Sequence, residues 1–252
     1  MIKSKKLSKF KYIKHAFLNK LESKATGMHK SLNCSPGSFD SKKKIFIDFV
    51  TIQKKIKSSF KKVILLNQIH SNKFYYIDKN LKYNNKLEGD ALITNRSNTM
   101  IGVLTADCAP ILLHDKNNKM VAAIHAGWRG AFKGIVSKVV KFMIKKGCTP
   151  ENMTAVIGPC ISIKSYEVKQ NFIKKFIKKD KKNKIFFKKI GTKNYFNLNK
   201  YVYSQLKSLK IKNIETIKKD TFDIKNNFYS ARRSISFNDN NYSRNISIIM
   251  IN

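Results

Sequence analysis

The sequence has few acidic residues, few cysteines and no long apolar run. Asp and Glu together number 15, against 52 Lys and Arg, so the formal net charge is +37 at pH 7. No stretch approaches the roughly 20 consecutive apolar residues of a membrane-spanning helix. The basic first residues are not followed by the apolar block of a secretory signal. These absences predict a cytoplasmic protein with no membrane partner.

The four cysteines show neither a disulfide framework nor a zinc-finger spacing. They lie at positions 34, 108, 148 and 160, with no CxxC pair among them. Small secreted domains carry closely and regularly spaced cysteines. We therefore expect reduced thiols, in agreement with a cytoplasmic location.

The excess of positive charge is accompanied by no recognisable DNA- or RNA-binding motif. Lysines are spread along the whole chain instead of being gathered in one arm. Asn and Ile, which like Lys are encoded by A/T-rich codons, are also abundant. We expect a solvated lysine surface that binds nucleic acid only non-specifically and in a salt-sensitive way.

The apolar residues predict a globular fold of mixed strands and helices. A chain of 252 residues, of which 42% are hydrophobic, can bury a real core. Between residues 132 and 144, apolar side chains repeat at spacings of three and four and Gly147 follows, which predicts an amphipathic helix and its end. Apolar runs predict strands over 14–20, 61–70, 88–94, 100–115, 120–126, 154–161 and 246–251, and helices over 168–177 and 197–209. Because these elements mix without a strict βαβ alternation, we expect a single α+β (mixed α/β) domain over residues 1–252, with mixed β-sheets flanked by helices.

Histidine and cysteine are scarce, yet three such residues lie in or at the ends of predicted strands. The segment LTADCAPILLHD (104–115) places Cys108 in an apolar run, and His70 and His125 each end another predicted strand. If these strands are neighbours in a sheet, the three side chains meet at one edge. One thiolate and two imidazoles form a three-ligand zinc site with an open fourth position, which is typical of catalytic zinc. By itself, the spacing favours a buried free cysteine and two core histidines.

A second candidate is the segment HAGWRGA (125–131), which leads from a predicted strand into a helix. Gly127 leaves backbone N–H groups accessible and Arg129 adds a cation, so the segment suits an anion such as phosphate. A glycine-rich turn with Trp128 as a core residue explains the same pattern. The sequence leaves both interpretations open.

Three further residues lie close to these segments in the sequence. Asp107 is a candidate proton carrier or a support for the metal ligand beside it, since on a strand its side chain points away from that of Cys108. Cys160 follows a Gly-Pro turn, where we favour packing over a nucleophilic role. His114 is interpreted as a residue at the end of a strand.

Five sequence blocks occur in the order in which one protein family has them. They closely resemble the YfiH family: NQIHS (67–71), EGDALIT (88–94), GVLTADCAPILLHD (102–115), AAIHAGWRGAFKGI (122–135) and IGPCISIKSYEV (157–168). That family has been described as a polyphenol oxidase (laccase) domain, as a purine nucleoside phosphorylase and as a peptidoglycan editing factor. The resemblance implies a mixed α/β assembly of sheets flanked by helices.

The resemblance also implies a function. It places zinc on His70, Cys108 and His125, the same three residues that the ligand chemistry singles out. It implies phosphate-dependent cleavage of purine nucleosides such as adenosine, inosine, guanosine and methylthioadenosine, and hydrolytic deamination of adenosine. The candidate catalytic residues are then Cys108, with Asp107 for proton transfer to the departing base and Arg129 for phosphate.

The chain departs from the family pattern in three segments, 18–27, 50–55 and 235–245. The first lacks an Arg and a Gly-rich stretch, the second lacks an Asn-Arg pair, and the third retains only an arginine of an Asp-Gly…Thr-Gly-Arg pattern. These changes fall in the expected substrate-binding part and leave the metal ligands intact. The candidate contacts for substrate or phosphate are Gly127, Trp128, Arg129, Arg232, Arg233 and Arg244.

Two other enzyme classes fit the same residues. Cys and His ligands also hold copper, which would suit phenol oxidation, although five histidines are too few for a multicopper site. A hydrolase of misincorporated cell-wall precursors would use Cys108 as a nucleophile instead of a ligand. The sequence does not decide the preferred nucleoside, or whether the protein is a monomer or a homodimer.

Overall fold

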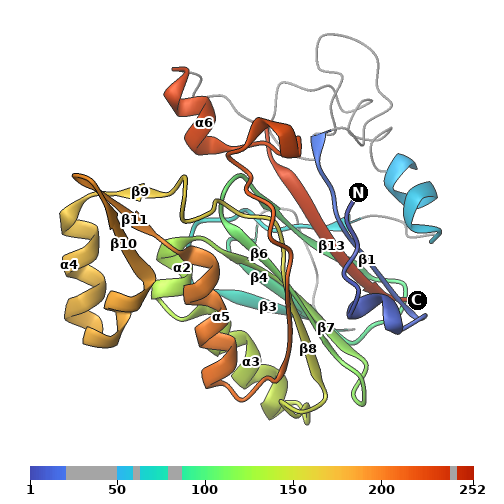
Figure 1. Ribbon diagram of the computed structural model, residues 1–252. Coiled ribbons are helices and arrows are strands. Elements are labelled where there is room, and N and C mark those ends of the chain that lie inside the picture. The colour runs from blue at the N-terminus through green and yellow to red at the C-terminus, as the bar shows by residue number, and fades with distance from the viewer. Residues whose placement is uncertain (21–49, 59–62, 79–86, 239–242) are drawn as a thin grey trace.

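Two β-sheets packed face to face form the centre of the molecule (Figure 1). The computed structural model describes residues 1–20, 50–58, 63–78, 87–238 and 243–252. Cys34 and most of the first departing segment (18–27) lie outside these residues.

The larger sheet holds most of the candidate site. Its strands are β3 (Phe74–Ile77), β4 (Ala91–Thr94), β6 (Ala109–Asp115), β7 (Met120–Ala126), β8 (Met153–Ile157) and β12 (Asn213–Thr216). They lie in the order β12-β8-β6-β7-β4-β3. The smaller sheet contains β1 (Ile13–Phe17), β2 (Val63–Ile64), β5 (Met100–Thr105) and β13 (Asn245–Ile251). Their order is β1-β13-β5-β2.

Strand β6 is buried on both faces, which explains its nearly unbroken apolar sequence. Ile111 and Leu113 join the apolar cluster on the helix side of the sheet, whereas Leu112 between them packs toward the smaller sheet. Since side chains alternate along a strand, β6 contributes to both cores. Packing on both faces therefore fixes the position of β6, whose first residue directly follows Cys108.

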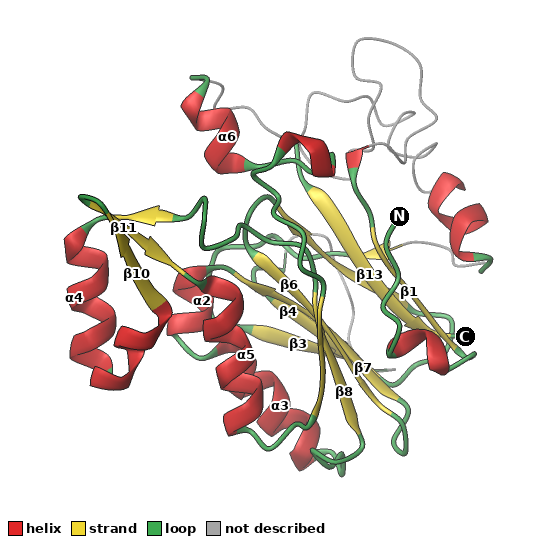
Figure 2. Cartoon of the chain, viewed as in Figure 1, coloured by secondary structure: helices red, strands yellow, loops and turns green. Residues whose placement is uncertain are grey.

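Helices cover the outer face of the larger sheet. They include α2 (Trp128–Phe132), α3 (Ile135–Lys145) and α5 (Leu198–Ser208) (Figure 2). The helix predicted from residue 132 begins at Ile135 instead, because the chain breaks after α2 and Gly134 takes a φ of +86°. That left-handed conformation favours glycine. Gly147 follows α3 with a φ of +91°, as predicted for the end of this helix.

A smaller unit extends the fold to one side (Figure 2). It consists of α4 (Gln170–Lys179) and a three-stranded sheet of β10 (Phe187–Ile190), β11 (Lys193–Phe196) and β9 (Glu167–Val168). Phe172 and Phe176 of α4 stack with ring centroids 4.7 Å apart, and Phe196 lies against both. The other described elements are η1 (Leu7–Lys9), η3 (Lys181–Phe186), η4 (Ile224–Asn226), α6 (Ala231–Ser236) and a helical stretch at residues 50–56.

Two of the predicted strands are wrong, and both differences change where candidate site residues lie. Residues 100–115 form two strands, because the chain turns at 106–108 and β5 and β6 belong to different sheets. The strand predicted over 61–70 is reduced to β2, and His70 lies beyond it with a left-handed φ of +55°. Cys108 and His70 are therefore loop residues, as functional residues often are.

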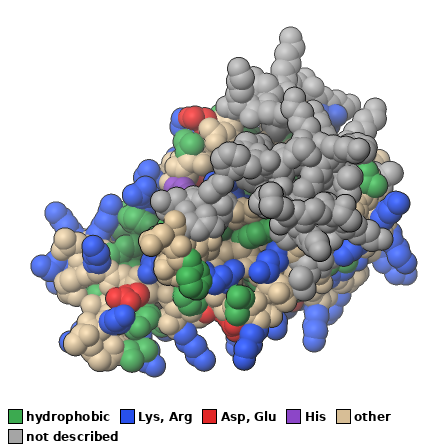
Figure 3. All heavy atoms as spheres, turned by 90° about the horizontal axis from the view of Figure 1, so that it is seen from above, with side chains coloured by type: hydrophobic (Ala, Val, Ile, Leu, Met, Phe, Trp, Pro, Cys, Tyr) green, Lys and Arg blue, Asp and Glu red, His purple; other side chains and the backbone are tan. Residues whose placement is uncertain are grey.

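On the face drawn in Figure 3, the described lysines do not gather into a single patch. Figure 3 shows Lys and Arg side chains spread over the described part of one face, with few acidic groups among them. Among the helices that the structure describes, none is long and apolar enough to cross a membrane. The observed α+β architecture, with mixed sheets flanked by helices, confirms the predicted fold class.

Candidate metal centre

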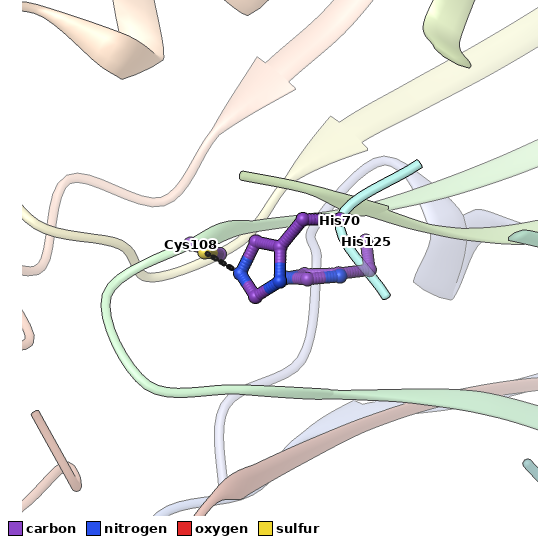
Figure 4. Close-up of side chains that lie close together, drawn as sticks. All are labelled: His70, Cys108 and His125. Atoms are coloured by element: carbon purple, nitrogen blue, oxygen red, sulfur yellow. Dashed lines mark hydrogen bonds between the residues drawn. The ribbon is translucent and has the colours of Figure 1, made fainter. Parts of the chain in front are cut away.

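The adjoining ends of β6 and β7 bring Cys108 and His125 together. These strands pair antiparallel with Pro110 opposite His125, and Cys108 lies directly before the first residue of β6. His70 reaches the same place from the loop after β2. Figure 4 shows the three side chains side by side. The three side chains therefore lie together, as predicted. His125 lies at the end of a strand, whereas Cys108 and His70 lie in loops.

The donor atoms of these residues are close enough to share one metal ion. One ligand atom from each residue lies within 4.8 Å of the other two, and Cys108 Sγ is 3.7 Å from His70 Nε2. Sulfur and nitrogen ligands at ordinary zinc bond lengths stand about 3.5 Å apart on a tetrahedral ion. His125 is buried, Cys108 is half-buried and His70 is exposed, so the site opens to solvent beside His70. This donor set fits zinc and also copper.

Asp90, a buried carboxylate that sequence reasoning missed, connects two of the ligands. Its Oδ1 lies 2.8 Å from His125 Nδ1 and accepts a hydrogen bond from the His70 backbone N–H at 3.0 Å. Its Oδ2 accepts from the backbone N–H and the hydroxyl of Ser71. A carboxylate on Nδ1 fixes the tautomer of a histidine and leaves its Nε2 free for a metal. The available signal was an acid at the start of an apolar strand, in a chain with only 15 acids.

The ligands change one another's affinity for protons. Burial raises the pKa of the Cys108 thiol, but the imidazoles of His125 and His70 outweigh burial, so the pKa falls below its ordinary value. Burial lowers the pKa of His125, but the Cys108 sulfur and the Asp90 carboxylate outweigh it and raise the pKa. The cluster therefore favours the thiolate, which is the form of cysteine that binds metals.

Gly127 lies directly against two of the candidate ligands, Cys108 and His70. A Cβ atom on Gly127 would stand 2.8 Å from Cys108 Sγ and 2.9 Å from His70 Cδ2. Any side chain at this position would displace the ligands. Gly127 was expected to contact substrate. Because it has no side chain, it leaves room for Cys108 and His70 to lie side by side.

Asp107 joins three distant segments beside the cluster. Its Oδ1 accepts from the Thr221 hydroxyl at 2.6 Å, and its Oδ2 accepts from the Ser230 hydroxyl at 2.9 Å and the Arg232 backbone N–H at 2.7 Å. It is buried and has a φ of +85°, an uncommon conformation for a residue other than glycine. Because Asp107 lies in a turn, the strand alternation expected to point it away from Cys108 does not apply. Three donors on one carboxylate favour a positioning role, in which Asp107 holds the start of α6 beside Cys108.

Two of the candidate arginines have guanidinium groups that remain available to a ligand. Arg129 is exposed, and its guanidinium carbon lies 5.3 Å from the centre of the Trp128 ring. Arg232 donates one N–H to the Glu167 carbonyl at 3.1 Å and lies over the ring of Tyr166. We keep both as candidate contacts for substrate or phosphate.

The other two arginines are placed differently. The guanidinium of Arg233 donates to the backbone carbonyls of Thr221, Phe222 and Phe228. This is a structural role, so we leave Arg233 out of the proposed substrate contacts. Arg244 is exposed and directly precedes β13, next to Asn245.

Cys160 and His114 lie outside the cluster. Cys160 is buried, and burial raises the pKa of its thiol to about 12, which fits the expected packing role. His114 lies at the far end of β6, fully buried against Phe10 and Tyr12. Within the described ranges, His70, Cys108 and His125 form the only group of His, Cys, Asp and Glu side chains whose geometry suits a metal ion.

A comparison with protein families gives a match over nearly the whole chain. Residues 14–252 match the family described as multi-copper polyphenol oxidoreductase laccase. The chain belongs to this family. It is the YfiH family that the five sequence blocks predict. Two solved structures share the fold. The YfiH protein of Bacillus licheniformis gives a TM-score of 0.85 at 23% identity and covers 96% of this chain and 94% of its own. A Neisseria meningitidis protein gives 0.82 at 26% identity, with 96% and 95% covered.

Relatives of this YfiH-family chain carry a more specific name. A purine nucleoside phosphorylase of Rickettsia prowazekii is 37% identical over 174 residues, which are 68% of this chain and 71% of the relative. A purine nucleoside phosphorylase of Rickettsia conorii is 36% identical over 203 residues, 79% of this chain and 82% of the relative.

Proposed function

We propose that this chain is a zinc-dependent purine nucleoside phosphorylase that also deaminates adenosine, with the metal on His70, Cys108 and His125. The observation that carries the proposal is the cluster of one thiol and two imidazoles, whose ligand atoms lie within 4.8 Å of one another. The names of relatives that are 36% and 37% identical support the phosphorylase assignment. The expected substrates are phosphate and adenosine, inosine, guanosine or methylthioadenosine.

The protein's own side chains prepare the site for a metal and for a nucleoside. A bound zinc ion would supply Lewis acidity and lower the pKa of bound water to about 7. Asp90 orients the imidazole of His125 and, through the backbone N–H, the loop of His70. Exposure of His70 leaves one side of the cluster accessible to a substrate.

Phosphorolysis requires cations where phosphate binds. A phosphate oxygen forms a bond to C1′ of the ribose while the C1′–N9 bond breaks, and its electron pair leaves with the base. Arg129 and Lys175 each place their charge 5.3 Å from the centre of the Trp128 ring, so positive charge lies beside the residue that follows Gly127, which supports a phosphate site there. Helix α2 is only five residues long, so its dipole adds little and the phosphate site rests on these side chains.

The test is turnover by protein whose metal content has been measured. Protein with zinc near one per chain is incubated with adenosine, inosine or methylthioadenosine, with and without phosphate, and the products are separated by chromatography. We expect free base only when phosphate is present, and inosine from adenosine without phosphate. Cys108→Ala should lose the metal and slow both reactions at least roughly 1000-fold.

Cys148→Ala is the matched control, because Cys148 is a buried thiol outside the cluster. It should retain both metal and turnover. Full activity of metal-free Cys108→Ala protein would refute the proposal. Bound copper with oxygen consumption on phenols would favour the oxidase that the family description names. Turnover that survives removal of the metal but is lost in Cys108→Ala would favour the hydrolase in which Cys108 is the nucleophile.

A further inference from the structure

His70 is the candidate ligand whose ring has the least support. It is exposed, lies in the loop after β2 and has a left-handed φ of +55°. Among the described residues, its ring nitrogens have one hydrogen-bond partner, the Cys108 sulfur, and no carboxylate reaches them as Asp90 reaches His125. The place of His70 in the cluster (Figure 4) is therefore set by the loop that carries it.

The side chain of Gln68, two residues before His70, ties this loop to strand β5. Its Nε2 donates to the Leu104 carbonyl at 2.7 Å, and its Oε1 accepts from the Leu104 backbone N–H at 2.8 Å. We call this pair of bonds the Gln68 clamp. Two bonds to one residue fix the orientation of the amide as well as its distance. Gln68 is half-buried, so these bonds are stronger than they would be in open solvent.

The Gln68 clamp takes the place of a strand partner that β5 lacks at this point. Strand β2 pairs parallel with β5 over two residues only, Val63 and Ile64, and then ends. Leu104 is buried and lies beyond the end of this pairing. Because buried backbone groups need hydrogen-bond partners, the N–H and C=O of Leu104 hold the amide of Gln68 in place. The loop therefore stays beside β5 after the strand itself has ended.

The Gln68 clamp joins the chain segments that lead to two of the ligands. Leu104 is the second-last residue of β5, and a short turn leads from β5 to Cys108. On the other side of the clamp, Gln68 is followed by Ile69 and then by His70. The clamp thus lies within a few residues of both Cys108 Sγ and His70 Nε2, which are 3.7 Å apart.

We propose that Gln68 is a positioning residue for the metal centre, because its clamp on Leu104 holds His70 at the distance from Cys108 that a shared metal ion requires. The inference rests on the three-ligand metal centre of the proposed function. Asp90 holds the backbone N–H of His70 next to the larger sheet, and Gln68 holds the same loop against the smaller sheet. Loss of the clamp would let the exposed ring move away and leave a site with two ligands.

The test is a double-mutant cycle on zinc affinity in the full chain, measured by competition with a metal-binding dye. Gln68→Met keeps the length of the side chain but removes both bonds to Leu104, so zinc affinity should fall about 10–100-fold, as for other groups that orient a metal ligand. His70→Ala removes the ligand itself and should lower the affinity further. When His70→Ala is already present, Gln68→Met should change zinc affinity less than about twofold, because its effect passes through His70.

Cobalt in place of zinc gives a second measurement, since its visible absorption depends on its ligands. In Gln68→Met, the charge-transfer band between the Cys108 sulfur and cobalt should remain. The bands that report the number and geometry of the ligands should shift toward those of His70→Ala. A general loss of stability would leave the spectrum of the cobalt-loaded protein unchanged, and that result would overturn the proposal.

Gln205→Met is the matched control. Gln205 is also half-buried and donates to a backbone carbonyl, that of Ala131 at 2.9 Å, but it lies on α5. Zinc affinity and the cobalt spectrum of this variant should equal those of the wild type. If Gln68→Met does not fold, Gln68→Glu takes its place, because its carboxylate still accepts from the Leu104 N–H. Zinc affinity should then fall by a smaller factor, and again only when His70 is present.

Wild-type zinc affinity in Gln68→Met, or an equal loss with and without His70, would also overturn the proposal. Metal binding can be measured without turnover, so this inference and the proposed function can fail separately. The expected cycle in a protein that does not cleave nucleosides would refute the phosphorylase and retain the role of Gln68. Phosphate-dependent cleavage by a protein whose zinc affinity does not depend on Gln68 would retain the phosphorylase and refute that role.

Discussion

At one end of the β6–β7 pair, His125 lies 2.8 Å from Asp90 and close to Cys108. At the other end, His114 is fully buried against the rings of Phe10 and Tyr12, and its Nδ1 has no hydrogen-bond partner in the described part of the chain. The pKa of His125 is raised, whereas burial lowers the pKa of His114 to about 4. The same strands thus hold one histidine with a carboxylate and a thiol beside its ring and one whose ring is enclosed by aromatic side chains.

The difference comes from the partners of each histidine. Asp90 and Cys108 supply negative charge to His125, which compensates for burial. Asp115 follows His114 directly, but its carboxylate accepts from the backbone N–H groups of Asn117, Asn118 and Thr149. These hydrogen bonds stabilise the turn after β6, and the charge of Asp115 raises the pKa of His114 too little to outweigh burial. A histidine in a strand is therefore a ligand candidate only when a carboxylate or thiolate reaches its ring.

The largest expected contrast comes from replacing each histidine by leucine. His125→Leu should lower metal affinity by at least roughly 1000-fold, because it removes one of three ligands. His114→Leu should leave metal content unchanged and shift the free energy of unfolding by less than about 1 kcal/mol. It removes a 3.3 Å contact with the Tyr12 hydroxyl together with an unpaired buried nitrogen, and these two changes oppose each other.

Metal analysis after dialysis and urea unfolding provide the two measurements. Retention of metal near one per chain in His125→Leu would show that His125 is no ligand. Loss of metal from His114→Leu, with folding intact, would show that the two ends of the strands are coupled, and the contrast between them would not hold.

The cluster of two histidines and one cysteine could be predicted from the sequence because few residues in the chain could bind a metal at all. The chain has five histidines and four cysteines, and the resemblance of the surrounding blocks to the YfiH family singled out His70, Cys108 and His125 where spacing by itself did not. Apolar runs also located β7 and β13 well, since both are buried along their whole length. Periodicity detects such burial directly.

The local geometry of the site could not be predicted, because it depends on contacts between residues far apart in the sequence. The turn at 106–108 interrupts an apolar run that reads as one strand, and tertiary packing alone divides it between two sheets. The position of His70 depends on hydrogen bonds from its own loop to Asp90. The carboxylate of Asp107 is held by Thr221 and Ser230, more than a hundred residues away.

A smaller contrast is expected from the two carboxylates. Asp90→Asn keeps the size of the side chain but removes the charge that orients His125, so metal affinity should fall about 10–100-fold. Asp115→Asn should leave metal affinity unchanged and lower the free energy of unfolding by about 1–2 kcal/mol, because its backbone N–H partners lose a charged acceptor. Competition with a metal-binding dye gives the affinities. If the two variants bind the metal with equal affinity, Asp90 does not support the metal ligands.

The smallest effect concerns the pH dependence of stability at the His114 end. An unfolded histidine has an ordinary pKa of 6.5, whereas burial holds the pKa of His114 at about 4 in the folded protein. Below pH 6.5 the unfolded chain binds a proton that the folded chain does not. The free energy of unfolding therefore falls as the pH drops from 6.5 toward 4, and does not change for this reason above that range. Between pH 7 and pH 5.5, His114 should contribute a loss of about 1 kcal/mol.

His114→Leu should remove that contribution from the difference in unfolding free energy between pH 7 and pH 5.5, measured with urea. Asp115 acts in the opposite direction on the His114 imidazole, but burial is the larger effect. His15 is also buried with its pKa lowered to about 4, and it stays in the variant, so part of the pH dependence must remain. If wild type and His114→Leu lose the same stability on acidification, His114 takes up its proton in the folded protein as readily as in the unfolded chain. In that case, the aromatic rings around His114 would not explain why the two ends of β6 differ.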